Sequence, residues 1–529
     1  MGRKPILRNT SKWKLSAGLV LAGLMVMAVH ATAASSRPAN NPPWYPSLQA
    51  FEHYNSGRSH VFSMATFGGS MTGRNRVDMV ASRNGQYPSG YNMSYLNAKA
   101  AFIQGGSYGD VKGSIGPYVA KLNPNTLKPR WYTQLRNTKK RHEWDYPGAM
   151  AIESDGFIYA VSGFHLWKVD PANGKVVKTL RLPTVVFNRS NYPETPAEYY
   201  HEPSQNAINT SYNGINALPD GTIVLKSLYR TAGCPLQGPS AVLTCNQTQN
   251  VPRSVLVSVN PRTMRIIDRV TLDAFAGARP TITRYRGVDY VYLLEKVASP
   301  VRYIVTHGKF TFDESWQPAI PTSGQTAGGS LIVMNKWIVG ATNTPPSAAP
   351  LIVFAIRQSD GSKVLTTQPY VSDPISPELA KAFSQAATVN GQKVPAISWA
   401  DMSLEADPQN HRFYGVETLA RKIAAFRITN QGIQTVWKKT QTTTEWATLI
   451  GPRTHRVWVG TDIPGAEIPG NNKHDVVVWR DAASGRELAR SRRVPAMTQG
   501  SAIQPGYGGS VYFPSAKGTL FKLTPHPAR

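Results

Sequence analysis

The chain has 529 residues and a formal net charge of +27, with 58 lysines and arginines against 31 aspartates and glutamates. Such a charge favours anionic binding partners, either an anionic small molecule or an envelope component with anionic groups. It does not predict a nucleic-acid partner, because the longest basic cluster, residues 136–142, has no run of aromatic stacking residues around it.

The first 34 residues have the three parts of a secretory signal. A basic start is followed by an apolar run from Leu15 to Val29 and by the small residues 31–34. That run is shorter than the roughly 20 apolar residues that span a bilayer, so cleavage near Ala33 or Ala34 is predicted rather than a retained anchor. We expect a periplasmic or secreted protein with no transmembrane segment after cleavage. Removal of the five lysines and arginines of the leader would leave a charge of +22.

Cys234 and Cys245 are the only cysteines, and both lie in one Gly/Pro/Ser-rich stretch. In an oxidising compartment a disulfide between them is the natural expectation. Their spacing fits neither a zinc ribbon, nor a Cys-x-x-Cys redox site, nor a c-type haem attachment, so no haem is predicted. We expect the mature chain to be a monomer.

A strand, turn, strand phrase recurs along the chain, and a repeat of this kind decides the fold. The clearest copies are Tyr118–Trp131, Leu166–Thr179 and Leu256–Ile267, and weaker copies follow at 303–316, 352–364, 424–437, 476–488 and 520–525. Each copy has alternating apolar residues on both sides of an Asx-Pro, Asn-Gly or Asp-Gly turn, which is the hairpin signal. A second strand pair precedes most copies, for example Gly148–Ile152 with Phe157–Val161.

Four strands per unit and about eight units, with hardly any helical periodicity, predict an all-β fold in which residues 35–529 form a single β-propeller. Eight blades are favoured over seven. Because the final unit stops after its third strand, residues 45–75 are expected to supply the missing outer strand and close the ring.

The phrase Lys168–Lys175 (Lys-Val-Asp-Pro-Ala-Asn-Gly-Lys) and its relatives resemble the repeats of the quinoprotein-like propeller superfamily, named after pyrroloquinoline quinone. The resemblance covers nearly the whole mature chain and implies the propeller fold. The superfamily contains enzymes as well as non-catalytic assembly scaffolds, so the resemblance leaves the function open.

Long insertions fall on one face of the predicted disc, namely the face that carries the connections between blades and those between second and third strands. The largest are 184–211, 228–253 and 370–398. Long loops on one face of a rigid scaffold are where binding and catalysis usually reside. The first insertion holds an acidic aromatic patch, so its Tyr199, His201 and Glu202 are candidate substrate-binding residues together with His142 near the same mouth.

The residues that open the innermost strands point into the predicted channel, and several are polar. Asp145, Asp401 and Glu445 are candidate catalytic carboxylates, because carboxyl groups held close together can supply a general base with a raised pKa. Asn213, Asp145 and Asp401 are candidate Ca²⁺ ligands, since Ca²⁺ prefers carboxylate and amide oxygens. Asn213-Gly-Ile followed by Pro219-Asp-Gly also looks like the strand entry of gluconolactonase-type propellers, where the resemblance implies a metal-binding Asn.

Two functional classes follow from these residues, and the sequence leaves open whether the protein is an enzyme. The first is a Ca²⁺-assisted hydrolase of the lactonase or esterase type, and the alternative is a binding or scaffold propeller for an envelope partner. A quinoprotein-like dehydrogenase is a second alternative. It is disfavoured, since such enzymes are expected to carry an adjacent cysteine pair over the quinone, and Cys234 and Cys245 are not adjacent.

Overall fold

Antiparallel four-stranded sheets account for nearly all the secondary structure of the described residues, as the alternating apolar pattern predicts. The computed structural model describes residues 42–67, 71, 75–106, 116–138, 143–184, 210–229, 253–295, 300–321, 326–327, 329–343, 351–373, 377, 386–389, 392–395, 404–443, 445–465, 467, 472–498 and 500–526. All of them belong to one unit, Pro38–Arg529. Within these ranges, no helix has the length and apolar character needed to cross a membrane.

The first four blades follow one another in chain order, each built from consecutive antiparallel strands. Blade 1 contains β3 (Gly90–Asn97), β4 (Ala100–Gly105), β5 (Tyr118–Leu122) and β6 (Pro129–Gln134). Blade 2 contains β7 (Pro147–Ile152), β8 (Ile158–Ser162), β9 (His165–Val169) and β10 (Val176–Arg181). Blade 3 contains β11 (Thr210–Ala217), β12 (Ile223–Tyr229), β13 (Val255–Asn260) and β14 (Arg265–Thr271). Blade 4 contains β15 (Thr281–Tyr285), β16 (Val288–Leu294), β17 (Pro300–Thr306) and β18 (Lys309–Phe312).

The last four blades vary this plan. Blade 5 has a divided innermost strand, β19 (Thr326–Ala327) and β20 (Ile332–Met334), then β21 (Trp337–Asn343), β22 (Val353–Arg357) and β23 (Val364–Thr367). Blade 6 contains β26 (Leu404–Asp407), β27 (Arg412–Glu417), β28 (Lys422–Ile428) and β29 (Ile433–Thr440). Blade 7 contains β30 (Thr448–Ile450), β31 (Val457–Asp462), β32 (His474–Asp481) and β33 (Glu487–Arg490), with β34 (Val494–Pro495) added to β32. Blade 8 contains β35 (Gln504–Pro505), β36 (Val511–Pro514), β37 (Leu520–His526) and β2 (Arg76–Ala81).

The remaining elements are short. The insertion after blade 5 carries a hairpin of β24 (Ala386–Val389) and β25 (Gln392–Pro395), and β1 (Val61–Phe62) runs parallel to β30. Single-turn 3₁₀ helices follow three innermost strands, and they are η3 (Pro408–Asn410), η4 (Arg453–His455) and η5 (Tyr507–Gly509).

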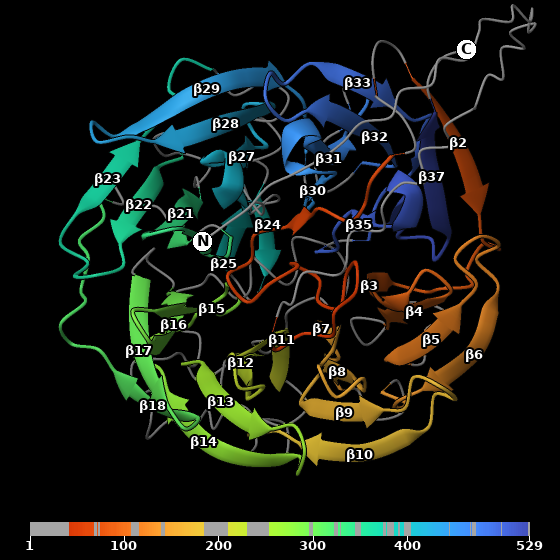
Figure 1. Ribbon diagram of the computed structural model, residues 1–529, viewed down its shortest axis with the longest axis horizontal. Helices are drawn as coiled ribbons and strands as arrows, with labels where there is room; N and C mark the ends of the chain where they lie inside the picture. Colours follow the sequence, from red (N-terminus) through yellow and green to blue (C-terminus); the bar gives the residue numbers. More distant parts are fainter. Residues whose placement is uncertain are drawn as a thin grey trace, which may run out of the picture. The chain divides into compact units, whose positions relative to one another are not determined.

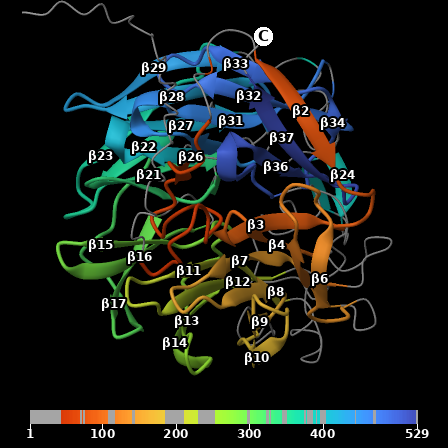
Figure 2. The same cartoon turned by 45° about the vertical axis from the view of Figure 1, so that its right-hand side comes forward.

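Eight sheets surround one axis, which confirms the predicted propeller and the choice of eight blades over seven (Figure 1). Closure of the ring by an N-terminal segment is also confirmed, because β2 is the outer strand of blade 8 beside β37 (Figures 1 and 2). The predicted bounds of that strand were wrong. It lies at Arg76–Ala81 rather than within residues 45–75, and the described residues that precede it have a different role.

The two faces of the ring differ in their connections. All turns that join first to second and third to fourth strands within a blade lie among the described residues, and none exceeds six residues. We call their side the short-turn face. On the other side, which we call the long-loop face, the ends of consecutive strands are far apart in the chain: 28 residues separate Arg181 from Thr210, 25 separate Tyr229 from Val255, and 36 separate Thr367 from Leu404.

Adjacent blades interlock through tryptophans that pack on glycines of the next blade. Trp131 in β6 lies against Gly174, and Trp437 in β29 lies against Gly485. A Cβ at Gly174 would lie 2.7 Å from Trp131 Cε3, and its φ of +78° also favours glycine. Trp437 additionally donates from Nε1 to Ala482 O at 3.1 Å. The glycine of each turn therefore makes room for an indole ring from the preceding blade.

Residues 48–62, which we call the axial segment, lie inside the ring (Figure 1). They occupy the place along the axis where the sequence predicted an open channel. Backbone N–H groups of six innermost strands donate to carbonyls of this segment at 2.8–3.0 Å. The donor and acceptor pairs are Tyr95 to Gln49, Ile152 to Ala50, Ile282 to Ser56, Val333 to Gly57, Ala406 to Ser59 and Leu449 to His60.

The two remaining blades are reached by side chains. Ser56 Oγ donates to Ala217 O in blade 3 at 2.8 Å, and Gln49 Nε2 donates to Gln504 Oε1 in blade 8 at 2.7 Å. The innermost strand of a blade has no neighbouring strand on its axial side, so its backbone groups there need other partners. The axial segment supplies such partners to seven blades, and it contacts the eighth through the side chain of Gln504.

Candidate functional site at the channel axis

Several residues singled out in the sequence fall outside the described residues: His142, Tyr199, His201, Glu202, Cys234, Cys245 and Asp401. Their proposed roles stay predictions, as does the disulfide. Asp145, Asn213 and Glu445 are described, and each lies within or just before an innermost strand at its long-loop end.

Asp145 precedes β7 and is buried. Its Oδ2 accepts a hydrogen bond from Thr138 Oγ1 at 2.9 Å, and its backbone carbonyl accepts one from Ser162 Oγ at 2.8 Å. These contacts tie the connection between blades 1 and 2 to strand β8, so Asp145 has a structural role whatever else it does.

Asn213 lies in β11 and holds the connection that leads into blade 4. Its Nδ2 donates to Gly277 O at 3.1 Å, while its buried Oδ1 has no partner among the described residues. Lys226, opposite Asn213 in β12, donates to the same carbonyl at 3.3 Å. Burial lowers the pKa of the Lys226 ammonium well below its usual range.

Glu445 precedes β30, is buried, and accepts a hydrogen bond from Gly500 N at 2.8 Å. Burial raises its pKa well above the usual range, and the charge of Asp475 adds to the effect. Burial raises the pKa of the Tyr146 hydroxyl, and the charges of Glu445 and Glu52 raise it further. Burial of Glu445 therefore disfavours its charged form.

The described residues contain no group of three or more His, Cys, Asp or Glu side chains placed to hold a metal ion. Asp145 and Asn213 both bind protein groups, and the third predicted Ca²⁺ ligand, Asp401, is outside the described ranges.

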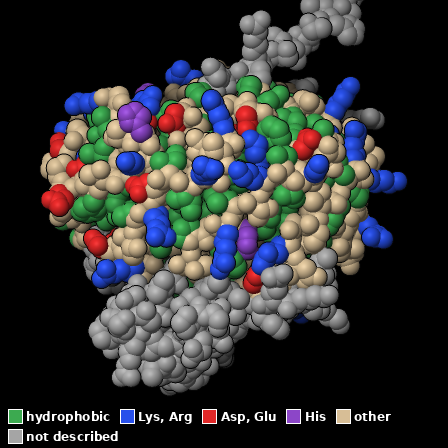
Figure 3. Space-filling view, turned by 90° about the horizontal axis from the view of Figure 1, so that it is seen from below, with side chains coloured by type: hydrophobic (Ala, Val, Ile, Leu, Met, Phe, Trp, Pro, Cys, Tyr) green, Lys and Arg blue, Asp and Glu red, His purple; other side chains and the backbone are tan. Residues whose placement is uncertain are grey.

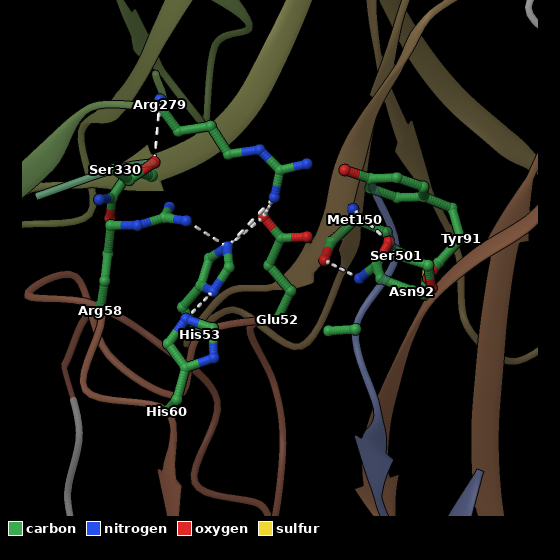
Figure 4. A network of polar contacts seen from close by, with 12 residues as sticks. Glu52, His53, Arg58, His60, Tyr91, Asn92, Met150, Arg279, Ser330 and Ser501 are labelled. Carbon is green, nitrogen blue, oxygen red and sulfur yellow. Dashed lines mark hydrogen bonds and ion pairs between the residues drawn. The ribbon is translucent and has the colours of Figure 1, made fainter. Parts of the chain in front are cut away.

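A different set of residues converges on the axis, and we call it the axial cluster. It contains Glu52, His53, Arg58 and His60 of the axial segment and Arg279 of the ring (Figure 4). Trp446 of the ring belongs to it as well, because Arg279 lies over its indole. Arg279 Nη1 pairs with Glu52 Oε1 and lies 3.1 Å from His53 Nε2. Arg58 Nη2 lies 2.5 Å from that same nitrogen.

Both imidazoles of the axial cluster are neutral. Burial lowers the pKa of His53 and of His60 well below 6.5, and neighbouring arginine charge lowers both further. One tautomer assignment satisfies the contacts with arginine, His60 and Ala447, but it leaves no proton between His53 Nε2 and Glu52 Oε1, which lie 2.8 Å apart. His53 Nε2 accepts from arginine, His53 Nδ1 donates to His60 Nε2, and His60 Nδ1 donates to Ala447 O at 3.2 Å.

The indole ring of Trp446 is the aromatic centre of the cluster. The His60 ring stacks on it at a centroid distance of 5.4 Å and an angle of 7°. The guanidinium carbons of Arg58 and Arg279 lie 5.1 and 5.5 Å from its centroid, and Arg279 also lies 5.4 Å from the centroid of Tyr91. Two cations thus share the aromatic surfaces of one tryptophan and one tyrosine.

Several hydrogen-bond donors of this region are buried and have no partner among the described residues. They are Arg58 Nε and Nη1, Tyr91 Oη and Trp446 Nε1. Arg58 and Tyr91 are both 0% exposed. Buried polar groups are nearly always paired, and a group that is not paired points to a bound water, ion or ligand or to a functional role.

Sequence reasoning missed Arg58, Tyr91, Arg279 and the axial segment itself. Trp446 adjoins the predicted Glu445, but nothing in its neighbourhood marks an axial position. The one available signal was that residues 48–62 do not carry the repeat phrase although they concentrate charged, histidine and aromatic side chains.

No family model and no curated protein matches this sequence. Among solved structures, the quinohemoprotein alcohol dehydrogenase of Comamonas testosteroni matches with a TM-score of 0.55 at 12% identity, over 94% of this chain and 82% of that chain. A europium-containing methanol dehydrogenase matches with a TM-score of 0.53 at 8% identity, over 90% of this chain and 89% of that chain. At these identities the likeness is one of fold alone, and the chain shares the β-propeller fold.

Proposed function

We propose that this protein is an exported binding propeller that takes an anionic, acceptor-rich organic ligand at the long-loop end of its axis. The observation that carries the proposal is the set of unpartnered buried donors on Arg58, Tyr91 and Trp446. Export rests on the leader predicted for residues 1–34, which lie outside the described residues.

The charge balance of the axial cluster supports an anion. Glu52 pairs with Arg279, both histidines are neutral, and Arg58 has no carboxylate partner of its own among the described residues. Burial lowers the pKa of the Arg58 guanidinium well below its usual range, and the charge of Arg279 lowers it further. Burial raises the pKa of Glu445, which precedes Trp446 in the chain, and so disfavours its charged form. A buried cation without a counter-charge costs several kcal/mol, and an anionic ligand would remove that cost.

The chemistry of the donors also suggests the ligand class. Guanidinium groups bind carboxylates with paired N–H donors, and the unpartnered Tyr91 Oη and Trp446 Nε1 offer further donors to ligand oxygens. A polycarboxylate with additional oxygen acceptors matches both properties. Pyrroloquinoline quinone, after which the superfamily that the repeats resemble is named, is such a molecule, so Arg58 and Arg279 would hold its carboxylates and Trp446 and Tyr91 would donate to its other oxygens. It would supply two-electron redox chemistry when bound.

The hydrolase hypothesis finds less support in the described residues. It requires Ca²⁺ near Asn213, Asp145 and Asp401, and the two that are described bind Gly277 and Thr138. The scaffold hypothesis is compatible with a bound ligand at the axis, because a partner protein would dock on the long-loop face around it. Ligand binding is therefore the function that the described residues support best.

The decisive variant is Arg58→Met, measured with the mature protein. Thermal shift and calorimetry with aliphatic and aromatic carboxylates, including pyrroloquinoline quinone, should find a ligand that stabilises the wild type. Arg58→Met should weaken that ligand at least tenfold. Because the variant removes a buried unpaired charge, the unfolding temperature without ligand should stay the same or rise.

Arg302→Met is the matched control. Arg302 is also buried, but its Nε and Nη2 bind Asp313 Oδ2 at 2.8 and 2.5 Å. Breaking this pair should cost about 3–5 kcal/mol and leave ligand affinity unchanged. The proposal fails if no carboxylate binds the wild type, or if Arg58→Met loses stability as Arg302→Met does.

A further inference from the structure

The outer hairpins of blades 1 to 3 concentrate positive charge, and we call this surface the basic rim. It consists of β5–β6, β9–β10 and β13–β14. These three hairpins contain ten lysines and arginines against two acidic residues, Asp170 and Asp268. By contrast, the equivalent hairpin of blade 7, β32–β33, holds three basic and three acidic residues. The outer hairpin of blade 6, β28–β29, is also basic, with four basic and no acidic residues, but it exposes no large apolar side chain.

The basic rim is one continuous surface. Thr133 Oγ1 in β6 donates to Gly174 O of blade 2 at 2.8 Å, and Lys178 Nζ in β10 donates to Thr263 O of blade 3 at 2.6 Å. Figure 3 looks at this side of the ring, with lysine and arginine side chains spread across it. A partner that contacts one of the three outer strands is thus within reach of the next.

Each of these outer strands also exposes one large apolar side chain. Tyr132 in β6 is 44% exposed, Val177 in β10 is 52% exposed, and Ile266 in β14 is 36% exposed. Arg130, Lys175 and Arg265 lie within two residues of them and are exposed as well. Isolated apolar side chains among cations are a property of surfaces that bind the headgroup region of anionic membranes.

We propose that the basic rim binds an anionic lipid bilayer peripherally, edge-on to the ring. The cations attract anionic headgroups over a range of about one Debye length, and the three apolar side chains enter the boundary between headgroups and acyl chains. Those apolar side chains favour a bilayer over a soluble acidic polymer, which has no apolar layer to receive them. The axis of the propeller then lies along the membrane, which leaves both faces open to solvent.

The test is co-sedimentation of the mature protein with vesicles. Vesicles of phosphatidylcholine with about 30% phosphatidylglycerol should bind the protein at low salt, and pure phosphatidylcholine vesicles should not. High salt should release the protein. Arg130→Glu with Lys175→Glu and Arg265→Glu should lower the partition coefficient at least tenfold. Val177→Ser with Ile266→Ser should lower it several-fold without changing retention on immobilised dextran sulfate.

The control variant carries the same change of net charge elsewhere, with Lys336→Glu, Arg427→Glu and Lys439→Glu on exposed positions of blades 5 and 6. Its vesicle binding should stay within about twofold of the wild type. Equal losses in the two triple variants would mean that only net charge matters and would overturn the proposal. Retention on dextran sulfate without vesicle binding would assign the basic rim to a soluble polyanion and would overturn it too.

Discussion

The side chain of Arg279 lies directly across Gly214, and a Cβ at residue 214 would be 2.6 Å from Arg279 Cγ and 2.7 Å from Arg279 Cδ. Gly214 also has a φ of +74°, a conformation that other residues rarely adopt. The glycine therefore serves two needs at once, since it allows the turn of the backbone in β11 and it opens the path by which Arg279 reaches Glu52 at the axis.

Gly214→Ala should destabilise the protein through both effects. Gly85→Ala separates them, because Gly85 has a similar φ of +70° with nothing within 4 Å. We expect Gly85→Ala to cost about 1–2 kcal/mol, for the left-handed backbone alone. Gly214→Ala should cost a further 1–3 kcal/mol, roughly, for the overlap with Arg279. Denaturant unfolding measures both, and equal losses would contradict the role of Arg279.

The axial segment should be required for the stability of the ring. A chain that begins at residue 42 keeps every described contact, whereas a chain that begins at residue 63 removes the acceptors for six innermost strands. The first should unfold like the mature protein. The second should unfold at least 10 °C lower, roughly, since several kcal/mol of buried hydrogen bonding are lost. A synthetic peptide of residues 42–67 should raise its unfolding temperature again. Equal unfolding temperatures for the two truncations would show the segment to be dispensable.

Glu405 should make stability depend on pH. It is fully buried beneath Trp458, whose Nε1 donates to Glu405 Oε2 at 3.2 Å, and burial raises its pKa to about 8. An acid whose pKa is raised on folding stabilises the protein below its unfolded pKa, and that contribution is lost as pH rises through the folded pKa. The free energy of unfolding should therefore fall between about pH 5 and pH 9.

Glu405→Gln should remove this part of the pH dependence, a difference of about 2–4 kcal/mol between the two ends of the range. Glu314→Gln, at an exposed position, is the control and should follow the wild type. Chemical denaturation at several pH values provides the measurement. Parallel pH curves for the wild type and Glu405→Gln would mean that the carboxyl group is already ionised in the folded protein.

The sequence predicted the blades well because their signals are local. Each hairpin phrase carries its alternation and its turn within about 15 residues, and the phrases that end at Trp131 and Trp437 already contain the indoles that join neighbouring blades. The sequence predicted that an N-terminal strand closes the ring, but it placed this strand too early in the chain. Residues 76–81 resemble no other outer strand closely enough to set the bounds.

The axial cluster could not be predicted for the opposite reason. Its members come from three distant parts of the chain, and their meeting depends on the register of the axial segment inside the ring. Asn213-Gly214 illustrates the difficulty. The sequence drew attention to the amide as a ligand, whereas the structure shows that the neighbouring glycine admits Arg279 to the axis. Close approach between distant residues leaves no periodic trace in a sequence.

The hydrogen bond between Gln49 and Gln504 has a consequence for the order of folding. The residues that fill the axis are among the first to be synthesised, but one of their partners belongs to the last blade. Contacts of such long sequence separation are slow to form. Blades 1 and 2 can pair with Gln49 and Ala50 early, whereas the contact with blade 8 must wait for the residues of the last blade. The centre of the ring is therefore completed only when its circumference closes.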